Sequence, residues 1–175
     1  MKIEMEGRAR RLGDDINTDY IISSSRKKDT LDPDALKRYL LESVDPDFAA
    51  SVAPGDVLVA GKNFGCGSAM EVAVTVVMAA GIRAVLAPSF ARTYYRNAIN
   101  NGLIPIECET GGIHEGDQLK IVLEEAGARI MNQTGKTIIT GLSMPAAMLA
   151  ILGEGGLVAY FRKHQDFRVS TTRPK

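Results

Sequence analysis

The chain has 175 residues, and its 21 Lys and Arg residues balance its 21 Asp and Glu residues, so the formal net charge is zero. This length predicts one domain with a substantial core, since domains typically hold about 100–200 residues. A balanced charge argues against a nucleic-acid-binding protein, which needs a basic face. No apolar run approaches the ~20 residues of a membrane span, and the N-terminus lacks an apolar signal core. We therefore expect a cytoplasmic protein that binds neither nucleic acid nor membrane.

The first third of the chain predicts a strand and a helix separated by a polar loop. Residues 1–12 are basic and mildly alternating, which predicts a strand, and residues 13–19 are turn formers. The apolar pair at residues 21–22 leads into a cationic segment, residues 23–29, that we expect to be flexible. Asp32-Pro33-Asp34 predicts the start of a helix, because proline suits the first helical turn.

A buried strand, a glycine turn and a helix are predicted next. The strand covers residues 57–60, and the glycine-rich turn that follows leads into an apolar segment, residues 70–80. Several β-branched residues in that segment would also allow a strand. We favour the helix because Ser68 and Glu71 have the spacing of a capping box and Gly81 is a typical helix terminator.

The remaining pattern predicts an α/β fold with a parallel-containing sheet and helices packed around it. Strands at 84–87 and 103–106 enclose a helix at 89–100, and successive strand–helix–strand units imply parallel strands with right-handed crossovers. Short strands and a helix interrupted by glycines are expected further on, at residues 118–123, 128–132, 136–140 and 144–161. We predict one domain over residues 1–162, followed by a polar tail, 163–175, that frays.

The cysteine and histidine pattern predicts no metal site in this chain. Cys66 and Cys108 are the two cysteines, and an iron–sulfur cluster typically needs about four thiolates. A zinc site would need His114 or His164, which are distant from both cysteines in sequence. Cys108 has the pattern of a buried strand residue.

The glycine turn predicts a site for a small anion. Gly65, Cys66 and Gly67 bring unencumbered backbone to the start of the predicted helix, where free N–H groups and the helix dipole favour a carboxylate or phosphate. The spacing is that of neither a dinucleotide-binding loop nor a Walker loop. Ser68 is either a helix cap or a hydroxyl that acts as a base once ionised. By spacing alone, Asp19 is a solvated turn carboxylate.

Three motifs in register resemble the small subunit of the aconitase superfamily, as in 3-isopropylmalate dehydratase and homoaconitase. They are residues 13–19, 61–68 and 89–102, and the likeness covers roughly residues 5–160. The resemblance implies a swivelling β/β/α domain that closes over a separate large subunit. That partner would carry a [4Fe–4S] cluster, which this chain would not bind.

The resemblance also implies an activity and roles for individual residues. The reaction would be reversible dehydration of a 2-hydroxy di- or tricarboxylic acid, a hydro-lyase activity that requires the large subunit. Ser68 would be the base that removes the proton beside a carboxylate, and Asp19 would belong to the proton-handling network. The backbone of Gly65, Cys66 and Gly67 would contact the substrate.

One position departs from the family pattern, which has arginine where this chain has Met70. A guanidinium binds a carboxylate bidentately, and methionine supplies neither charge nor donor. Another cation could take its place, with Arg26, Lys27 and Lys28 as candidates. The substrate could instead carry an apolar or smaller group there, or the chain could be a weakly active paralogue.

The segment from residue 23 to residue 30 lies where small subunits of this family vary with substrate. An apolar residue there would suit an isopropyl group, whereas Arg26 suits an additional carboxylate or is simply a solvated loop charge. The leading prediction is a 3-isopropylmalate dehydratase small subunit. Alternatives are a homoaconitase, a dimethylmalate or citramalate dehydratase, and a non-catalytic swivel domain with a binding or regulatory role.

Overall fold

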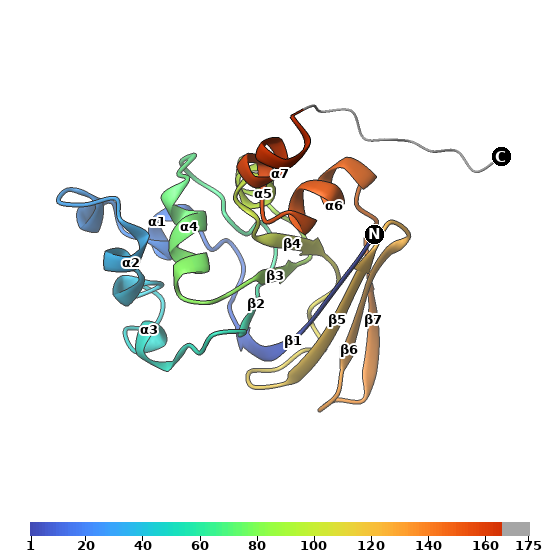
Figure 1. The fold of residues 1–175 in the computed structure, drawn as a ribbon. Coiled ribbons are helices and arrows are strands. Elements are labelled where there is room, and N and C mark those ends of the chain that lie inside the picture. Colours follow the sequence, from blue (N-terminus) through green and yellow to red (C-terminus); the bar gives the residue numbers. More distant parts are fainter. Residues whose placement is uncertain (166–175) are drawn as a thin grey trace.

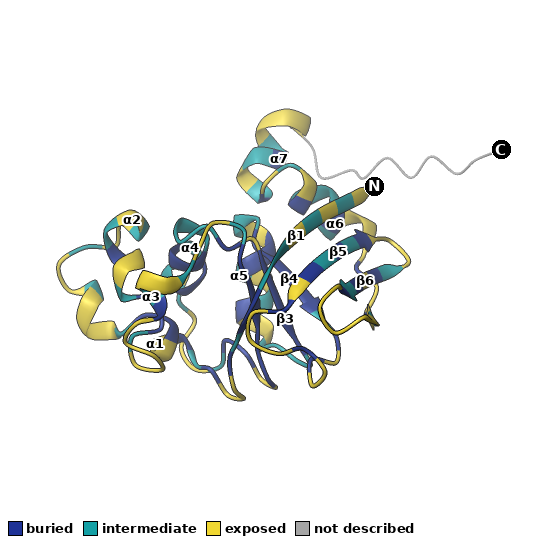
Figure 2. Cartoon of the chain, turned by 90° about the horizontal axis from the view of Figure 1, so that it is seen from below, coloured by how far each residue is buried: buried dark blue, intermediate teal, exposed yellow. Residues whose placement is uncertain are grey.

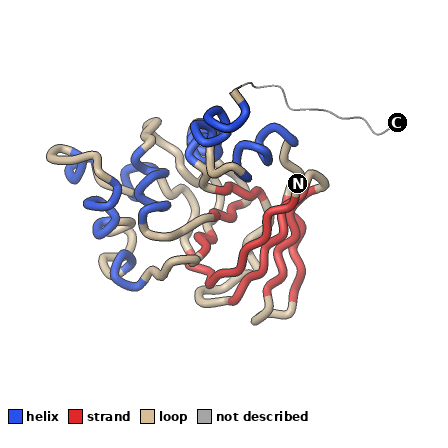
Figure 3. Tube along the Cα trace, viewed as in Figure 1, coloured by secondary structure: helices blue, strands red, loops and turns tan. Residues whose placement is uncertain are grey.

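The computed structural model describes residues 1–165, and a mixed seven-stranded sheet lies at their centre (Figure 1, Figure 3). The strand order is β4-β3-β2-β1-β5-β6-β7. The strands are β1 (Lys2–Arg11), β2 (Val57–Val59), β3 (Ala84–Ala87), β4 (Ile104–Glu107), β5 (Gln118–Glu124), β6 (Gly127–Asn132) and β7 (Thr137–Gly141). The predicted α/β fold class is confirmed.

Helices form two groups around the sheet. In Figure 1, α1 to α4 gather on one side and α5 to α7 gather near β4. The α-helices are α1 (Thr18–Ile21), α2 (Pro33–Leu36), α3 (Phe48–Ser51), α4 (Val72–Ala79), α5 (Arg92–Asn101), α6 (Ala146–Gly153) and α7 (Leu157–His164). Two 3₁₀ turns, η1 (Ser24–Lys27) and η2 (Lys37–Tyr39), extend the first group.

Strand β1 joins a parallel half of the sheet to an antiparallel half. Its residues 9–11 pair in parallel with β2, whereas its residues 2–8 pair antiparallel with β5. Strands β2, β3 and β4 are mutually parallel, as the strand–helix–strand pattern predicts. Strands β5, β6 and β7 form an antiparallel meander.

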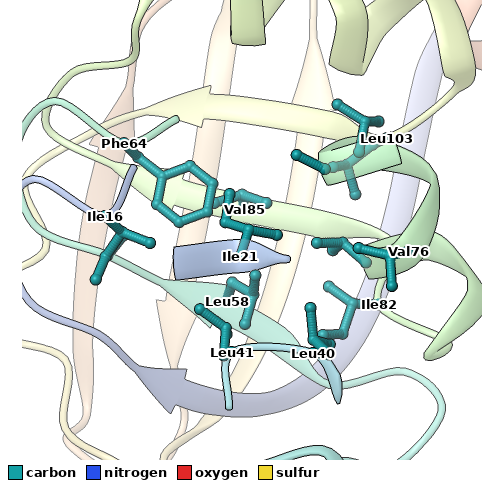
Figure 4. Close-up of a cluster of buried hydrophobic side chains, with 14 of the residues drawn as sticks. Ile16, Ile21, Leu40, Leu41, Leu58, Phe64, Val76, Ile82, Val85 and Leu103 are labelled. Atoms are coloured by element: carbon teal, nitrogen blue, oxygen red, sulfur yellow. The ribbon is translucent and has the colours of Figure 1, made fainter. Parts of the chain in front are cut away.

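The parallel strands are buried on both faces, because successive side chains of a strand point to opposite sides. Leu58 and Val85 belong to the core under α1 to α4, whereas Val57 and Leu86 belong to the core that includes β5, β6 and α6. Figure 2 shows the buried centre between exposed loops, and Figure 4 shows the first core at close range. Phe64 is fully buried in that first core, so the start of the glycine turn is anchored in the interior.

The helix predicted over residues 70–80 is confirmed, but the capping box is wrong. Helix α4 begins at Val72, and its N-cap, Glu71, makes no capping hydrogen bond through its side chain. Gly67 has a left-handed conformation, with φ of +90°, and residues 68–71 separate it from the first residue of α4. Ser68 therefore precedes the helix and its hydroxyl caps nothing.

The loop predicted before residue 32 is more ordered than its composition suggests. Residues 18–21 form the short helix α1, because the Asn17 side chain accepts a hydrogen bond from the Tyr20 N–H. The cationic segment contains η1, capped by the Ser23 side chain. The short helix α3 was not predicted. The predicted fraying tail was to begin at residue 163, but Lys163 and His164 belong to α7. The rest of that tail, from residue 166 onward, lies outside the described residues, and the domain boundary at residue 162 stays a prediction.

A saturated ionic network lies at the amino end of β2. The buried carboxylate of Asp56 accepts hydrogen bonds from Arg8 (3.1 and 2.8 Å), from Arg10 (3.4 Å) and from the Ala53 N–H (2.9 Å). Burial by itself would raise the pKa of Asp56, but these hydrogen bonds outweigh it and the pKa is lowered. Arg10 also lies over the Phe48 ring, 4.5 Å from its centroid. The network fixes the first helices against the sheet.

Candidate functional site

The carboxyl ends of β2 and β3 meet at one edge of the sheet, where ligands of parallel α/β proteins typically bind. The loop after β2 contacts the loop after β3 through two backbone hydrogen bonds, Phe64 N–H to Ser89 O (3.1 Å) and Ala91 N–H to Phe64 O (2.9 Å). The loop after β1 joins them, because Thr18 N–H donates to Cys66 O at 2.9 Å. Three loops distant in sequence thus form one rigid platform.

Gly65 is required by both its conformation and its surroundings. Its φ of +77° is in the left-handed region, and a Cβ there would lie 2.2 Å from the Cγ of Tyr94. Tyr94 is itself buried, and its hydroxyl donates to Ala73 O at 3.3 Å. The aromatic ring therefore packs directly on the glycine turn, and any larger residue would displace one or the other.

Several polar groups of the turn have no hydrogen-bond partner within residues 1–165. Ser68 is exposed, and in the described part of the chain its hydroxyl makes no hydrogen bond. The backbone N–H groups of residues 66–69 likewise donate to no atom of residues 1–165. The Ser68 carbonyl, by contrast, accepts a hydrogen bond from Thr18 Oγ1 at 2.9 Å, which holds the residue in place. A fixed backbone with open donors is suited to binding an anion.

A small pocket of about 60 Å³ lies over the turn. Its walls come from the three loops and from the start of α5, and they include Thr18, Gly65, Gly67, Ser68, Met70, Arg92 and Asn97. A pocket of this size admits a small group such as a carboxylate. The rest of such a ligand would project outward.

Asp19 adjoins this pocket without lining it. Its carboxylate accepts hydrogen bonds from the Ser24 hydroxyl and from the Ser24 N–H, the latter at 3.1 Å. The Ser24 hydroxyl is the main reason that the pKa of Asp19 is lowered. Its neighbour Thr18, rather than Asp19, contacts Ser68. The role of Asp19 in proton transfer stays a prediction.

Arg26 is engaged away from the glycine turn. Its guanidinium binds Glu42 through two hydrogen bonds of 2.8 and 3.0 Å, and it lies 4.0 Å from the centroid of the Tyr39 ring. To bind a substrate carboxylate it would have to give up Glu42. Its assignment as a substrate ligand also stays a prediction.

Met70 has a cation beside it. The Lys27 ammonium contacts the Met70 sulfur, so η1 lies against the residue that ends the glycine turn. Among the three candidate cations of the segment, this contact places Lys27 next to a residue that lines the pocket.

Arg92 and Asn97 line the pocket but were not singled out from the sequence. Both lie on α5, which begins directly after the loop that follows β3. Adjacent parallel strands end at one edge of a sheet, which places the residues after β2 and after β3 together. This rule would have been enough to find both residues. Arg92 is exposed and makes no ion pair in the described part of the chain.

The side chains of residues 1–165 do not form a ligand set for a metal ion or an iron–sulfur cluster. Over residues 1–165, no group of three or more His, Cys, Asp or Glu side chains could hold a metal ion. Cys66 is half-buried and unpaired in the glycine turn, whereas Cys108 is buried and also unpaired. Burial raises the pKa of the Cys108 thiol to about 12, which disfavours the thiolate that binds metals. No helix over the same residues is long and apolar enough to cross a membrane.

Comparison with known proteins identifies the family. The model of the aconitase C-terminal domain matches residues 19–111, which include the glycine turn and most of the pocket. This chain belongs to the aconitase family. The resemblance noted from the three sequence motifs is thereby confirmed.

The relatives of this aconitase-family chain are named as small subunits. It is 42% identical to the 3-isopropylmalate dehydratase small subunit 2 of Archaeoglobus fulgidus, over 95% of this chain and 100% of that one. It is 44% identical to the methanogen homoaconitase small subunit of Methanocaldococcus jannaschii, over 92% and 93% of the two chains. A crystal structure of 3-isopropylmalate dehydratase from the latter organism superposes with a TM-score of 0.88 at 42% identity, covering 93% of this chain and 96% of that one.

Proposed function

We propose that this chain is the small subunit of a hydro-lyase of the 3-isopropylmalate dehydratase type, active with a separate large subunit. The reaction is the reversible removal of water from a 2-hydroxy di- or tricarboxylic acid. The observation that carries the proposal is the exposed Ser68 hydroxyl, held beside open backbone donors on a rigid turn. The names of the relatives support the reaction class.

Ser68 acts as the base that takes the proton from the carbon beside a carboxylate. A serine hydroxyl is a weak base in water, so its ionised form needs donors or cations close by. The N–H groups of residues 66–69 are unused in the described chain, and Arg92 lines the same pocket. These groups stabilise the alkoxide and one substrate carboxylate together.

Substrate binding uses the backbone of Gly65, Cys66 and Gly67. The exposed Gly67 lets a carboxylate approach the main chain closely, whereas Gly65 is buried under Tyr94 and donates its N–H to Ile16 O. The pocket volume of about 60 Å³ admits that carboxylate, and the remaining substrate extends toward the partner. Asp19 completes the proton-handling network through Ser24, which it holds by two hydrogen bonds.

The large subunit carries the [4Fe–4S] cluster in this proposal, because the described part of this chain has no ligand set for it. When bound there, the cluster supplies the Lewis acid that accepts the substrate hydroxyl. The assembled enzyme works in the cytoplasm, where reducing conditions keep Cys66 and Cys108 as free thiols.

A homoaconitase is the second candidate, favoured by the 44% identity to a small subunit of that name. The two activities differ in the substituent of the substrate, a third carboxylate or an isopropyl group. The site described above binds the carboxylate common to both, so substrate identity depends on what lies beside it.

The test is to co-express this chain with a cluster-binding large subunit, rebuild the cluster without oxygen, and screen 2-hydroxy acids. The unsaturated product is followed by its absorbance. We expect dehydration of at least one di- or tricarboxylic substrate by the pair and no activity from this chain alone. A pair that assembles with its cluster intact and dehydrates none of the acids would contradict the proposal.

A further inference from the structure

Thr18 holds the glycine turn by two hydrogen bonds, one on either side of Gly67. Its backbone N–H donates to the Cys66 carbonyl at 2.9 Å, and its side-chain hydroxyl donates to the Ser68 carbonyl, also at 2.9 Å. Gly67 itself is exposed and has a φ of +90°. One residue of another loop thus fixes the carbonyl groups before and after the left-handed bend.

The local structure makes both donors of Thr18 available to the turn. Thr18 is the first residue of α1, and the first N–H groups of a helix have no partner within the helix. The Asn17 side chain accepts from the Tyr20 N–H, so it does not compete for the N–H of Thr18. Thr18 is only 2% exposed, and its buried hydroxyl needs an acceptor, which the Ser68 carbonyl provides. Both donors therefore bind the turn rather than α1.

The two held carbonyls fix the direction of two neighbouring N–H groups. The Cys66 carbonyl shares a peptide group with the Gly67 N–H. In the same way, the Ser68 carbonyl shares one with the Ala69 N–H. Because a trans peptide group is planar and its C=O and N–H point in opposite directions, both N–H groups point away from Thr18. Gly67 and Ala69 are exposed, and neither N–H donates to an atom of the described chain.

We propose that Thr18 is a positioning residue, which directs the Gly67 and Ala69 N–H groups at one carboxylate of the substrate. The proposal rests on the function proposed above. Amide donors that are already oriented bind an anion without reorganisation, whereas a turn whose peptide groups could rotate would have to be ordered by the ligand. Loss of the Thr18 hydroxyl should therefore weaken substrate binding through the turn.

The experiment compares Thr18→Val with Thr110→Val in the reconstituted pair of subunits. Thr110 is the matched control, because it is 1% exposed and its hydroxyl donates at 2.8 Å to the carbonyl of Ala60, which follows β2. Both changes remove a buried hydroxyl–carbonyl hydrogen bond, so the midpoint of thermal unfolding should fall to a similar extent.

Substrate affinity should distinguish the two variants. For Thr18→Val we expect KM for the acid that the pair dehydrates, and the calorimetric Kd of the assembled pair for citramalate, to rise about 10-fold or more. The kcat should fall by less, since Ser68 stays on the turn. Thr110→Val should leave KM and Kd within about twofold of wild type.

Two further variants separate the hydroxyl from the size of the side chain. Thr18→Ser and Thr18→Ala lack the same methyl group and differ only in the hydroxyl, so they also serve if Thr18→Val does not fold. Thr18→Ser should keep KM and Kd within about threefold of wild type, whereas Thr18→Ala should match Thr18→Val.

Equal KM and Kd in Thr18→Val and Thr110→Val would overturn the proposal, because Thr18 would then stabilise the fold only. An unchanged Kd with a lower kcat would also overturn it, since the hydroxyl would then affect the chemical step rather than carboxylate binding. A wild-type pair that binds citramalate but dehydrates no acid would count against the proposed function alone, because Kd still tests Thr18.

Discussion

The polar groups at the two ends of strand β2 differ in whether they have hydrogen-bond partners. At the amino end, Asp56 is buried and accepts hydrogen bonds from two arginines and a backbone N–H. At the carboxyl end, the Ser68 hydroxyl and the N–H groups of residues 66–69 have no partner in the described chain. A satisfied buried network specifies and stabilises a fold, whereas open donors on a rigid backbone are available to a ligand. The contrast separates the polar groups that stabilise the fold from those that we propose bind the substrate.

The largest effect on activity is expected at the carboxyl end of β2, where Ser68 lies. Ser68→Ala in the reconstituted pair should lower kcat by about 10²–10⁴-fold, the usual contribution of a positioned base. Stability should change by no more than ~0.5 kcal/mol, because the exposed hydroxyl has no partner. Steady-state kinetics and thermal unfolding check both values. Ser25→Ala, an exposed serine of η1, is the control, and equal kcat for the two variants would remove Ser68 from the chemistry.

At the amino end of β2, where Asp56 lies, we expect a large loss of stability and no change in substrate affinity. Asp56→Ala should cost about 3–5 kcal/mol of unfolding free energy, since it leaves the buried Arg10 without one of its anionic partners. Urea unfolding measures the loss. The folded fraction of this variant, assembled with the large subunit, should keep the wild-type KM. A raised KM with unchanged stability would mean that Asp56 serves substrate binding and not the stability of the fold.

Asp56 should also contribute to the loss of stability at acid pH. The pKa of Asp56 is lowered in the folded chain, so its contribution is present above its unfolded pKa of about 3.9 and is lost as the pH falls through the folded value. Below about pH 4, the wild type should therefore lose stability more steeply than Asp56→Asn. Urea unfolding between pH 7 and pH 3 tests this, and parallel curves for the two proteins would contradict it.

A substitution at Gly65 should lower both the stability and the activity. Gly65→Ala should cost about 2–4 kcal/mol, because φ is +77° and the new methyl would meet the Tyr94 ring. The displaced turn should also lower kcat. Gly13→Ala is the control, as nothing lies within 4 Å of a Cβ built there. A Gly65→Ala protein as stable and as active as Gly13→Ala would show that the turn is not rigid.

The smallest effect is expected at Arg26, whose side chain is tied to Glu42 at the surface. Arg26→Ala should leave the midpoint of urea unfolding nearly unchanged, because exposed ion pairs contribute little to stability. KM for di- and tricarboxylic substrates should change equally. A much larger rise for the tricarboxylic acid would mean that Arg26 exchanges Glu42 for the substrate.

The sequence was sufficient for the sheet and for the glycine turn. Regular apolar segments and glycines act locally, so the parallel strands and the helices after them followed from pattern alone. The capping box failed because α4 begins only at Val72, after a left-handed Gly67 that lies against Asn17 and Thr18 of the loop after β1. The contact between Lys27 and Met70 could not be assigned, because it joins two segments only through the packing of η1 against the turn. Arg92 lies inside the motif at residues 89–102 and at the start of the helix after β3, so both the motif and the topology pointed toward it.

The most direct measurement is deuterium exchange into the substrate in heavy water, catalysed by the reconstituted pair. Wild type should exchange the proton on the carbon beside the carboxylate faster than it releases the unsaturated product or at a comparable rate. Ser68→Ala should still bind citramalate but lose this exchange by two or more orders of magnitude. Exchange at the wild-type rate in Ser68→Ala would contradict the account, because the proton would then be taken by another group.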